Sequence, residues 1–236
     1  MNNLQEKQKT DLPSGEGNFF SAPLERRSFL RFTGAGLAGA ALVAVGCKKD
    51  NHNPSLGGTA TLDFKDDIGI LNYAYALEQL EAAFYIQVAA NPPAAFSAVE
   101  KAYFQDIQYH EIAHREFFKK ALGSAAIKSL EVDFSSINFS DKASVLATAK
   151  AFEDLGVAAY NGAGVRIKTD ANLIIAGKIA SVEARHAAYI RDLISNGSFA
   201  NSEVVDMNGL DLALPPNEVL TIAKKYIKTK IDVVNL

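Results

Sequence analysis

Four stretches of this 236-residue chain repeat apolar side chains at helical spacing, and each also carries a glutamate within its apolar stripe. The periodicity predicts helices at about 66–90, 97–123, 140–160 and 170–196. No stretch of comparable length alternates in the way a half-buried strand does. The expected fold class is therefore all-α, a four-helix bundle.

Local signals delimit these helices. The Asn91-Pro92-Pro93 run ends the first, and Ser97 with Glu100 forms a capping box that begins the second. Ser140 is expected to cap the third helix, Asp170 to cap the fourth, and Asn196-Gly197 to end it.

The remaining segments give the bundle its connections. Residues 124–139 show no sustained period, which suits a long crossover connection between two hairpins. Beyond the fourth helix, Leu214-Pro215-Pro216-Asn217 introduces a short final helix, expected at roughly 217–230. We therefore expect a bundle at 61–196 and a C-terminal extension with one short helix at 197–236.

The first residues have the order of an export signal. Arg26 and Arg27 precede Phe-Leu, and a weakly apolar Gly/Ala-rich run leads to Cys47. The arginines resemble a twin-arginine signal, and Ala44-Val45-Gly46-Cys47 resembles a lipoprotein processing site, although Ala44 is smaller than that pattern prefers. We expect residues 1–46 to be removed, residues 47–60 to form a flexible tether, and a lipid on Cys47 to anchor the protein to a membrane in the periplasm or cell envelope.

Charge and cysteine content narrow the function classes. The net charge is -3, and no cluster of basic and aromatic residues appears, so nucleic acid is not expected as a partner. Cys47 is the sole cysteine, which excludes an intramolecular disulfide and a cysteine-rich metal site. A bound metal must therefore be held by histidines and carboxylates.

Two Glu-x-x-His pairs, Glu111 with His114 and Glu183 with His186, lie in the apolar stripes of the second and fourth helices. A carboxylate in a water-excluding core needs a cation or a hydrogen bond to neutralise it. Two such helices, with a bridging glutamate from each of the other two, make the dinuclear carboxylate site of four-helix bundles. Glu153 is the expected bridging residue of the third helix.

The first helix offers two candidates, Glu78 and Glu81. Glu81 precedes Glu111 at the spacing that separates Glu153 from Glu183. Glu78 is better levelled with Glu111 across the hairpin, and Tyr85 follows it at the spacing by which Tyr160 follows Glu153. We favour Glu78 as the ligand and keep Glu81 as an alternative or an adjacent carboxylate. Tyr85 and Tyr160 are the tyrosines expected beside the ligands.

A competing interpretation starts from His110. His110-Glu111-x-x-His114 is also the string of zinc hydrolases, in which two histidines bind zinc and the glutamate activates water. That interpretation needs a third ligand and a cleft, and it leaves Glu183 and His186 unexplained. In the bundle, His110 is expected next to the ligands.

These motifs, together with Leu77–Tyr85 and Phe152–Tyr160, resemble the ferritin-like superfamily and, more narrowly, its desiccation-related branch. The resemblance implies two metal ions, iron first and manganese second, but no defined reaction or substrate. Two functions stay open: a di-iron oxidoreductase of ferroxidase or peroxidase type, acting on oxygen or peroxide under stress, and a non-catalytic envelope bundle with a structural or vestigial metal site. A homo-oligomer is compatible with either, and a closed storage cage is not expected.

Overall fold

The computed structural model describes residues 58–236. The predicted export signal with Arg26 and Arg27, the lipidation residue Cys47 and most of the tether lie outside these residues. Within residues 58–236, no helix combines the length and the apolar character needed to cross a membrane.

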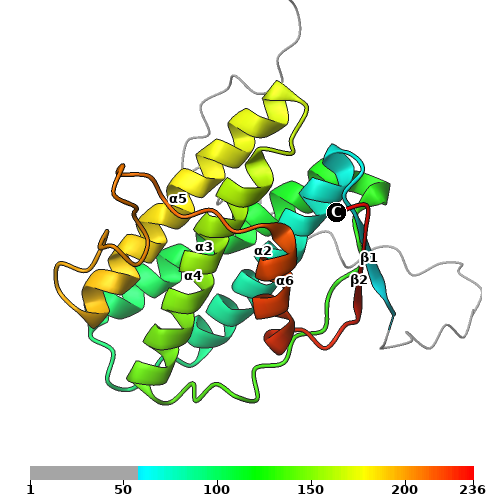
Figure 1. The fold of residues 1–236 in the computed structure, drawn as a ribbon. Helices are drawn as coiled ribbons and strands as arrows, with labels where there is room; N and C mark the ends of the chain where they lie inside the picture. The colour runs from blue at the N-terminus through cyan, green and yellow to red at the C-terminus, as the bar shows by residue number, and fades with distance from the viewer. Residues whose placement is uncertain (1–57) are drawn as a thin grey trace, which may run out of the picture. The chain divides into compact units, whose positions relative to one another are not determined.

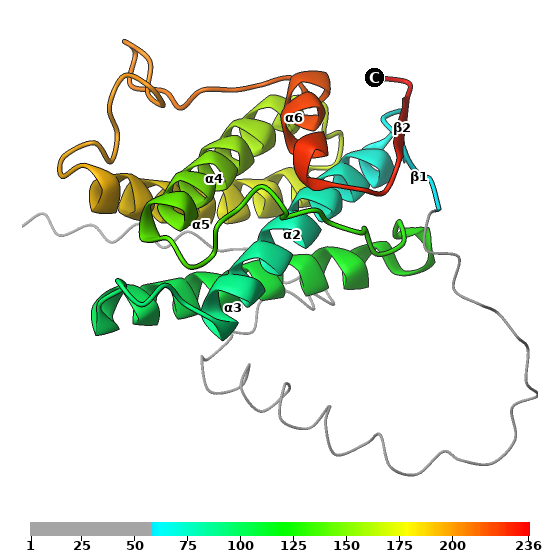
Figure 2. The same cartoon turned by 90° about the horizontal axis from the view of Figure 1, so that it is seen from below.

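Four long helices form two packed hairpins (Figures 1 and 2), and the all-α class is confirmed. α2 (Asp67–Ala90) packs on α3 (Ala98–Leu122), and α4 (Lys142–Gly164) packs on α5 (Asp170–Ile194). α2 also packs on α4, which joins the hairpins into one bundle. The residues between α3 and α4 form the long crossover connection that the sequence predicts.

Side-chain caps fix where three of these helices begin. Asp66 accepts a hydrogen bond from the Gly69 amide, and the predicted capping box at Ser97 and Glu100 is present. The third helix is capped by Asp141 instead of Ser140, because the Asp141 carboxylate accepts from the amides of Ala143 and Ser144.

The fourth helix also begins one residue from its expected cap. Asp170 is the first residue of α5 and not its cap; Thr169 occupies the cap position without a side-chain hydrogen bond there. Asp170 instead places a negative charge in the first turn, where it complements the helix dipole.

α2 is buried nearly all around, so polar groups on it must find partners inside the protein. Asn72 Oδ1 accepts from the Ile127 amide at 2.8 Å, and Gln79 Oε1 accepts from the Leu130 amide at 2.8 Å. These two side chains hold the crossover connection against the central helix.

The extension after α5 is more varied than expected. α6 (Pro216–Ala223) is followed by a 3-10 turn, η2 (Lys224–Tyr226), so the predicted helix at 217–230 is too long. The chain then forms β2 (Ile231–Val234), which pairs in parallel with β1 (Ala60–Asp63). Neither strand is expected from the sequence, and Ala60, the first residue of β1, lies within the predicted tether.

The extension shares the core of the bundle. Leu62, from β1, packs with buried residues of α2 and α4, and so do Val219, Ala223 and Ile227 near the C-terminus. The described residues therefore form one compact unit, in which β1 and the C-terminal extension pack on the same bundle.

Candidate metal centre

The helices bring four glutamates to the middle of the bundle. Glu78 comes from α2, Glu111 from α3, Glu153 from α4 and Glu183 from α5, and each is fully buried. His114 and His186 stand one helical turn after Glu111 and Glu183, with only 13% and 6% of their side chains exposed. Six of the seven candidate ligands, all but Glu81, therefore meet in one place.

These residues form two groups that share two members. The first group is Glu78, Glu111, His114 and Glu183, and the second is Glu111, Glu153, Glu183 and His186. In each group the candidate ligand atoms lie within 4.8 Å of one another. The glutamates that both groups share are those of the Glu-x-x-His pairs, whereas Glu78 and Glu153, which were expected to bridge, each belong to one group only.

Both histidines direct Nδ1 at the glutamates. His114 Nδ1 lies 2.8 Å from Glu183 Oε1 and 3.5 Å from Glu78 Oε2. His186 Nδ1 lies 3.0 Å from Glu111 Oε1 and 3.3 Å from Glu153 Oε2. Each imidazole thus presents the same nitrogen to its own group.

Most of the carboxylate oxygens and both imidazole Nδ1 atoms of the two groups lie close together but form no hydrogen bonds with one another. Among residues 58–236, none of the following buried atoms has a hydrogen-bond partner: Glu78 Oε2, Glu153 Oε2, both carboxylate oxygens of Glu111 and Glu183, and Nδ1 of His114 and His186. A buried polar atom without a partner is costly, and here the unpartnered atoms face one another. Imidazole nitrogens and carboxylate oxygens are the ligand atoms that iron and manganese bind in proteins, so the residues fit a pair of these metal ions.

The charges support the same fit. In their ionised forms the four buried carboxylates would carry four negative charges, which two divalent cations would balance with both histidines neutral. Burial and the charge of Glu183 raise the pKa of Glu111 to about 8, and burial raises the pKa of Glu153 to about 7. Burial alone would raise the pKa of Glu183, but the close rings of His114 and His186 outweigh it and lower that pKa to about 2.

Burial and neighbouring charge act on the two histidines in the opposite sense to the glutamates. Burial alone would lower the pKa of His114, but Glu78 and the other carboxylates raise it well above its usual value. The pKa of His186 is raised in the same way, with Glu153 the largest contributor. Protons and metal ions therefore compete for the same nitrogen and oxygen atoms.

Two tyrosines cross between the hairpins to reach the glutamates. The Tyr85 hydroxyl on α2 donates to Glu153 Oε1 on α4, and the Tyr160 hydroxyl on α4 donates to Glu78 Oε1 on α2. Burial, followed by the adjacent carboxylate charge, raises the pKa of both hydroxyls well above the usual value, which keeps them as donors. Each tyrosine leaves the other oxygen of its glutamate to face the cluster.

His110 lies beside the cluster and outside both groups. Its Nδ1 is 2.9 Å from His186 Nε2, and the two rings are nearly parallel. If His186 Nδ1 binds metal, its Nε2 carries the proton and donates a hydrogen bond to His110 Nδ1, which fixes the orientation of the His186 ring. A zinc hydrolase would need His110 and His114 to bind the same ion. His110 belongs to neither group of candidate ligands, so the geometry does not support the zinc-hydrolase interpretation.

Glu81 is buried but belongs to neither group. Its carboxylate lies against α4 where Gly156 has no side chain: a Cβ there would be 3.0 Å from Glu81 Oε1. Burial, followed by the charge of Glu183, raises the pKa of Glu81 well above its usual value. Of the two candidates on α2, Glu78 is the one placed among the ligands.

The fold and the cluster together define a class: a four-helix bundle whose core presents a carboxylate and histidine site able to hold metal. A family model of the ferritin-like domain matches residues 66–196, more than half of the sequence. The chain belongs to the ferritin-like family. A comparison with curated proteins gives no match.

Proposed function

We propose that this chain is an exported, lipid-anchored ferritin-like protein that holds two divalent metal ions, iron first and manganese second, between its four helices. The observation that carries the proposal is the pair of overlapping ligand groups joined by Glu111 and Glu183. A single ion would leave either Glu78 with His114 or Glu153 with His186 unused. Two ions use all six side chains.

The protein's part in any reaction follows from the burial of the site. When bound, iron or manganese would supply one-electron redox chemistry toward dioxygen or peroxide. The six side chains expose 0–13% of their surface, so they leave no room for an organic substrate against the ligands. The tyrosines and His110 hold the ligands in place, and the apolar core excludes water. A molecule with two non-hydrogen atoms, such as dioxygen or hydrogen peroxide, is the substrate class that fits.

The stoichiometry is tested by elemental analysis of residues 58–236 purified without chelator. We expect about two iron or manganese ions per chain, and none in the Glu111→Ala/Glu183→Ala double variant. Glu81→Gln is the matched control, since Glu81 is equally buried on α2 but lies outside both groups. One zinc ion retained by Glu183→Ala, or no metal in the wild type, would contradict the proposal.

The same burial favours a second candidate, a metal site without turnover in an envelope protein under drying or oxidative stress. Mixing ferrous ion with the metal-free protein in air separates the two candidates. Oxidation faster than in buffer, lost in Glu111→Ala and kept in Glu81→Gln, supports the oxidoreductase. Bound metal that reacts with neither oxygen nor peroxide supports the non-catalytic protein.

Export and anchoring rest on the sequence at Arg26, Arg27 and Cys47. We expect the wild-type protein to sediment with membranes and Cys47→Ser to be found in the soluble fraction of the envelope. Arg26→Lys/Arg27→Lys should keep the protein in the cytoplasm. A Cys47→Ser protein that still sediments with membranes would refute the lipid anchor.

A further inference from the structure

The extension after α5 forms one side of a second cavity, which lies against the α4 and α5 hairpin. Residues 197–215 pass over these helices (Figure 1) and leave a cavity of about 510 Å³ between themselves and the helices. That volume lies within the range of about 300–1,000 Å³ typical of small-molecule sites. It is open to solvent, in contrast to the buried metal centre.

The surfaces of this cavity are largely apolar. Its floor is made by alanines of the two helices, among them Ala158, Ala184 and Ala188, whose small side chains leave the space unfilled. Its mouth includes Phe199 and Leu212, which are 57% and 43% exposed. An apolar ring could cover this floor and remove both exposed side chains from water.

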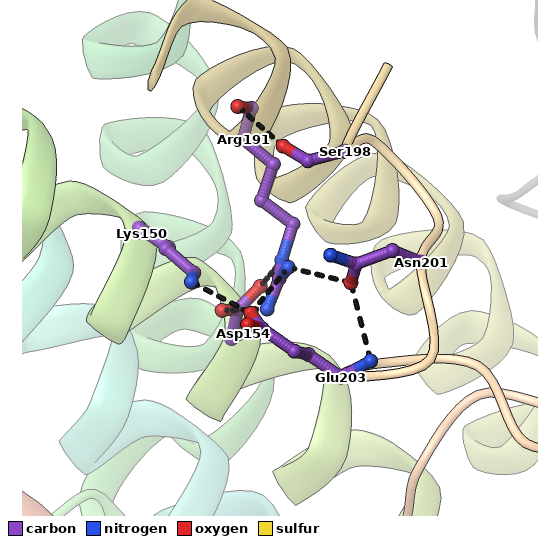
Figure 3. A network of polar contacts seen from close by, with 6 residues as sticks. All are labelled: Lys150, Asp154, Arg191, Ser198, Asn201 and Glu203. Atoms are coloured by element: carbon purple, nitrogen blue, oxygen red, sulfur yellow. Dashed lines mark hydrogen bonds and ion pairs between the residues drawn. The ribbon is translucent and has the colours of Figure 1, made fainter. Parts of the chain in front are cut away.

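A network of polar contacts holds the roof in place (Figure 3). The buried guanidinium of Arg191 donates to both oxygens of Asp154 at 2.8 Å, and its Nη1 donates to Asn201 and Glu203 on the roof at 3.1 and 3.0 Å. The Ser198 hydroxyl donates to the Arg191 carbonyl oxygen at 2.8 Å. Since four donor contacts already engage the guanidinium, it has little left for an anionic ligand.

The charges at the cavity are therefore unbalanced. Asp154, Glu203 and Asp211 line it together with the cation Arg191, and Lys150 pairs with Glu203 beside it, so these groups carry a net charge of -1. Arg191 pairs with Asp154 and shares Glu203 with Lys150. Within residues 58–236, Asp211 makes no side-chain ion pair, and it stands at the exposed rim. A positive group on a ligand would be stabilised there.

We propose that this cavity binds an organic cation, a molecule with an apolar ring for the alanine floor and an ammonium group for Asp211. Size, apolar floor and charge each contribute to this assignment. None of the six candidate metal ligands lines this cavity, so the assignment does not use the metal centre.

The protein contains no tryptophan, so the binding of an indole can be followed directly. Tryptamine is the test cation, and indole-3-acetate is its anionic match with the same ring. Fluorescence anisotropy of each indole, titrated with the purified full-length chain, gives the two affinities. We expect tryptamine to bind at least about tenfold more tightly than indole-3-acetate. Equal binding, tighter binding of the anion, or no binding of either would overturn the proposal.

Two substitutions locate the binding site. Ala188→Leu fills the floor and should abolish tryptamine binding, while Ala102→Leu, on the exposed face of α3, should leave it unchanged. Asp211→Asn removes a rim charge without filling space and should weaken tryptamine binding about tenfold without weakening the binding of indole-3-acetate. Because Asp211 is exposed, this variant keeps the test decisive if Ala188→Leu folds poorly. Unaltered tryptamine binding in both variants would exclude the cavity.

Discussion

At the scale of single residues, the metal centre depends on contacts that cross between the hairpins. Tyr85 and Tyr160 each begin on one hairpin and donate to a glutamate of the other, so neither glutamate is positioned by its own helix alone. The hydrogen bond fixes the carboxylate and directs its second oxygen toward the histidine. Ligands held in this way need less rearrangement when a cation binds.

Tyr85→Phe and Tyr160→Phe should therefore each weaken metal binding by about tenfold or more while keeping the number of ions per chain. Competition with a chelator of known affinity measures the change. Tyr109→Phe is the control, because Tyr109 is exposed on α3. Unchanged affinity in both Tyr85→Phe and Tyr160→Phe would show that the hydroxyls do not support the ligands.

The ligand residues could be predicted from the sequence because glutamate and histidine in an apolar stripe have few structural uses. Spacing along a helix gives the face and the level of each residue, and this brings Glu153 and both pairs together and favours Glu78 over Glu81. Spacing along a helix cannot give distances across the bundle, so the sequence does not show that Glu111 and Glu183 belong to both ligand groups. The partnership of Arg191 with Asp154 was missed for the same reason, since it joins two helices whose relative rotation the sequence does not fix.

At the scale of secondary-structure elements, helices meet other backbone segments at points where a side chain would not fit. A Cβ on Gly162 of α4 would lie 1.8 Å from the carbonyl oxygen of Leu214, in the segment that leads to α6. A Cβ on Gly177 of α5 would have no neighbouring atom within 4 Å. The same substitution should thus have opposite effects at these two glycines.

We expect Gly162→Ala to lower the free energy of unfolding by about 1–3 kcal/mol, because the extension must move away from α4. Gly177→Ala should raise it by about 0.5–1 kcal/mol, because alanine favours an open helical position. Urea denaturation measures both. A neutral Gly162→Ala would mean that the extension is not held against α4.

Asp67 joins the start of α2 to the turn before α5. Its carboxylate accepts from the amides of Lys168 and Thr169 at 2.8 and 3.0 Å and from the Asn172 side chain at 2.9 Å. Burial alone would raise the pKa of Asp67, but these hydrogen bonds outweigh it and lower that pKa to about 2. The lowered pKa stabilises the fold above pH 3.8, the usual aspartate value, and this contribution is lost as the pH falls toward 2.

Asp67→Ala should accordingly cost about 1–2 kcal/mol near neutral pH, and its deficit relative to the wild type should shrink as the pH falls from about 4 to 2. Unfolding measured at several pH values gives this difference directly. Asp170→Ala, in the first turn of α5, is a control without these three hydrogen bonds. A deficit independent of pH would contradict the role of the Asp67 charge.

The elements were predictable where a long period or a cap marked them. The helices span many turns, and the Ser97 capping box is local in the sequence. β1 and β2 are four residues each and pair across almost the whole domain, so neither has a periodic signal of its own. The length of α6 was overestimated because the apolar residues after Ala223 pack on the core from a turn and an extended segment.

At the scale of the whole molecule, stability and metal binding should be coupled. The bundle buries four carboxylates in its centre, and cations that neutralise them bind the folded state alone. A ligand present at about 100 times its dissociation constant adds about 2.7 kcal/mol to the free energy of unfolding. For a domain of this size, that gain corresponds to a rise in the melting temperature of about 5–10 °C.

We therefore expect metal loading to raise the melting temperature of residues 58–236 by about that amount, and much less in His114→Ala or His186→Ala, each of which removes one ligand from one group. Calorimetry with and without chelator measures both effects. His110→Ala is the control that separates ligands from neighbours, because it should keep most of the metal-dependent rise. Equal melting of the loaded and chelated wild type would mean that the four carboxylates are accommodated by protons and hydrogen bonds alone, and the coupling would be absent.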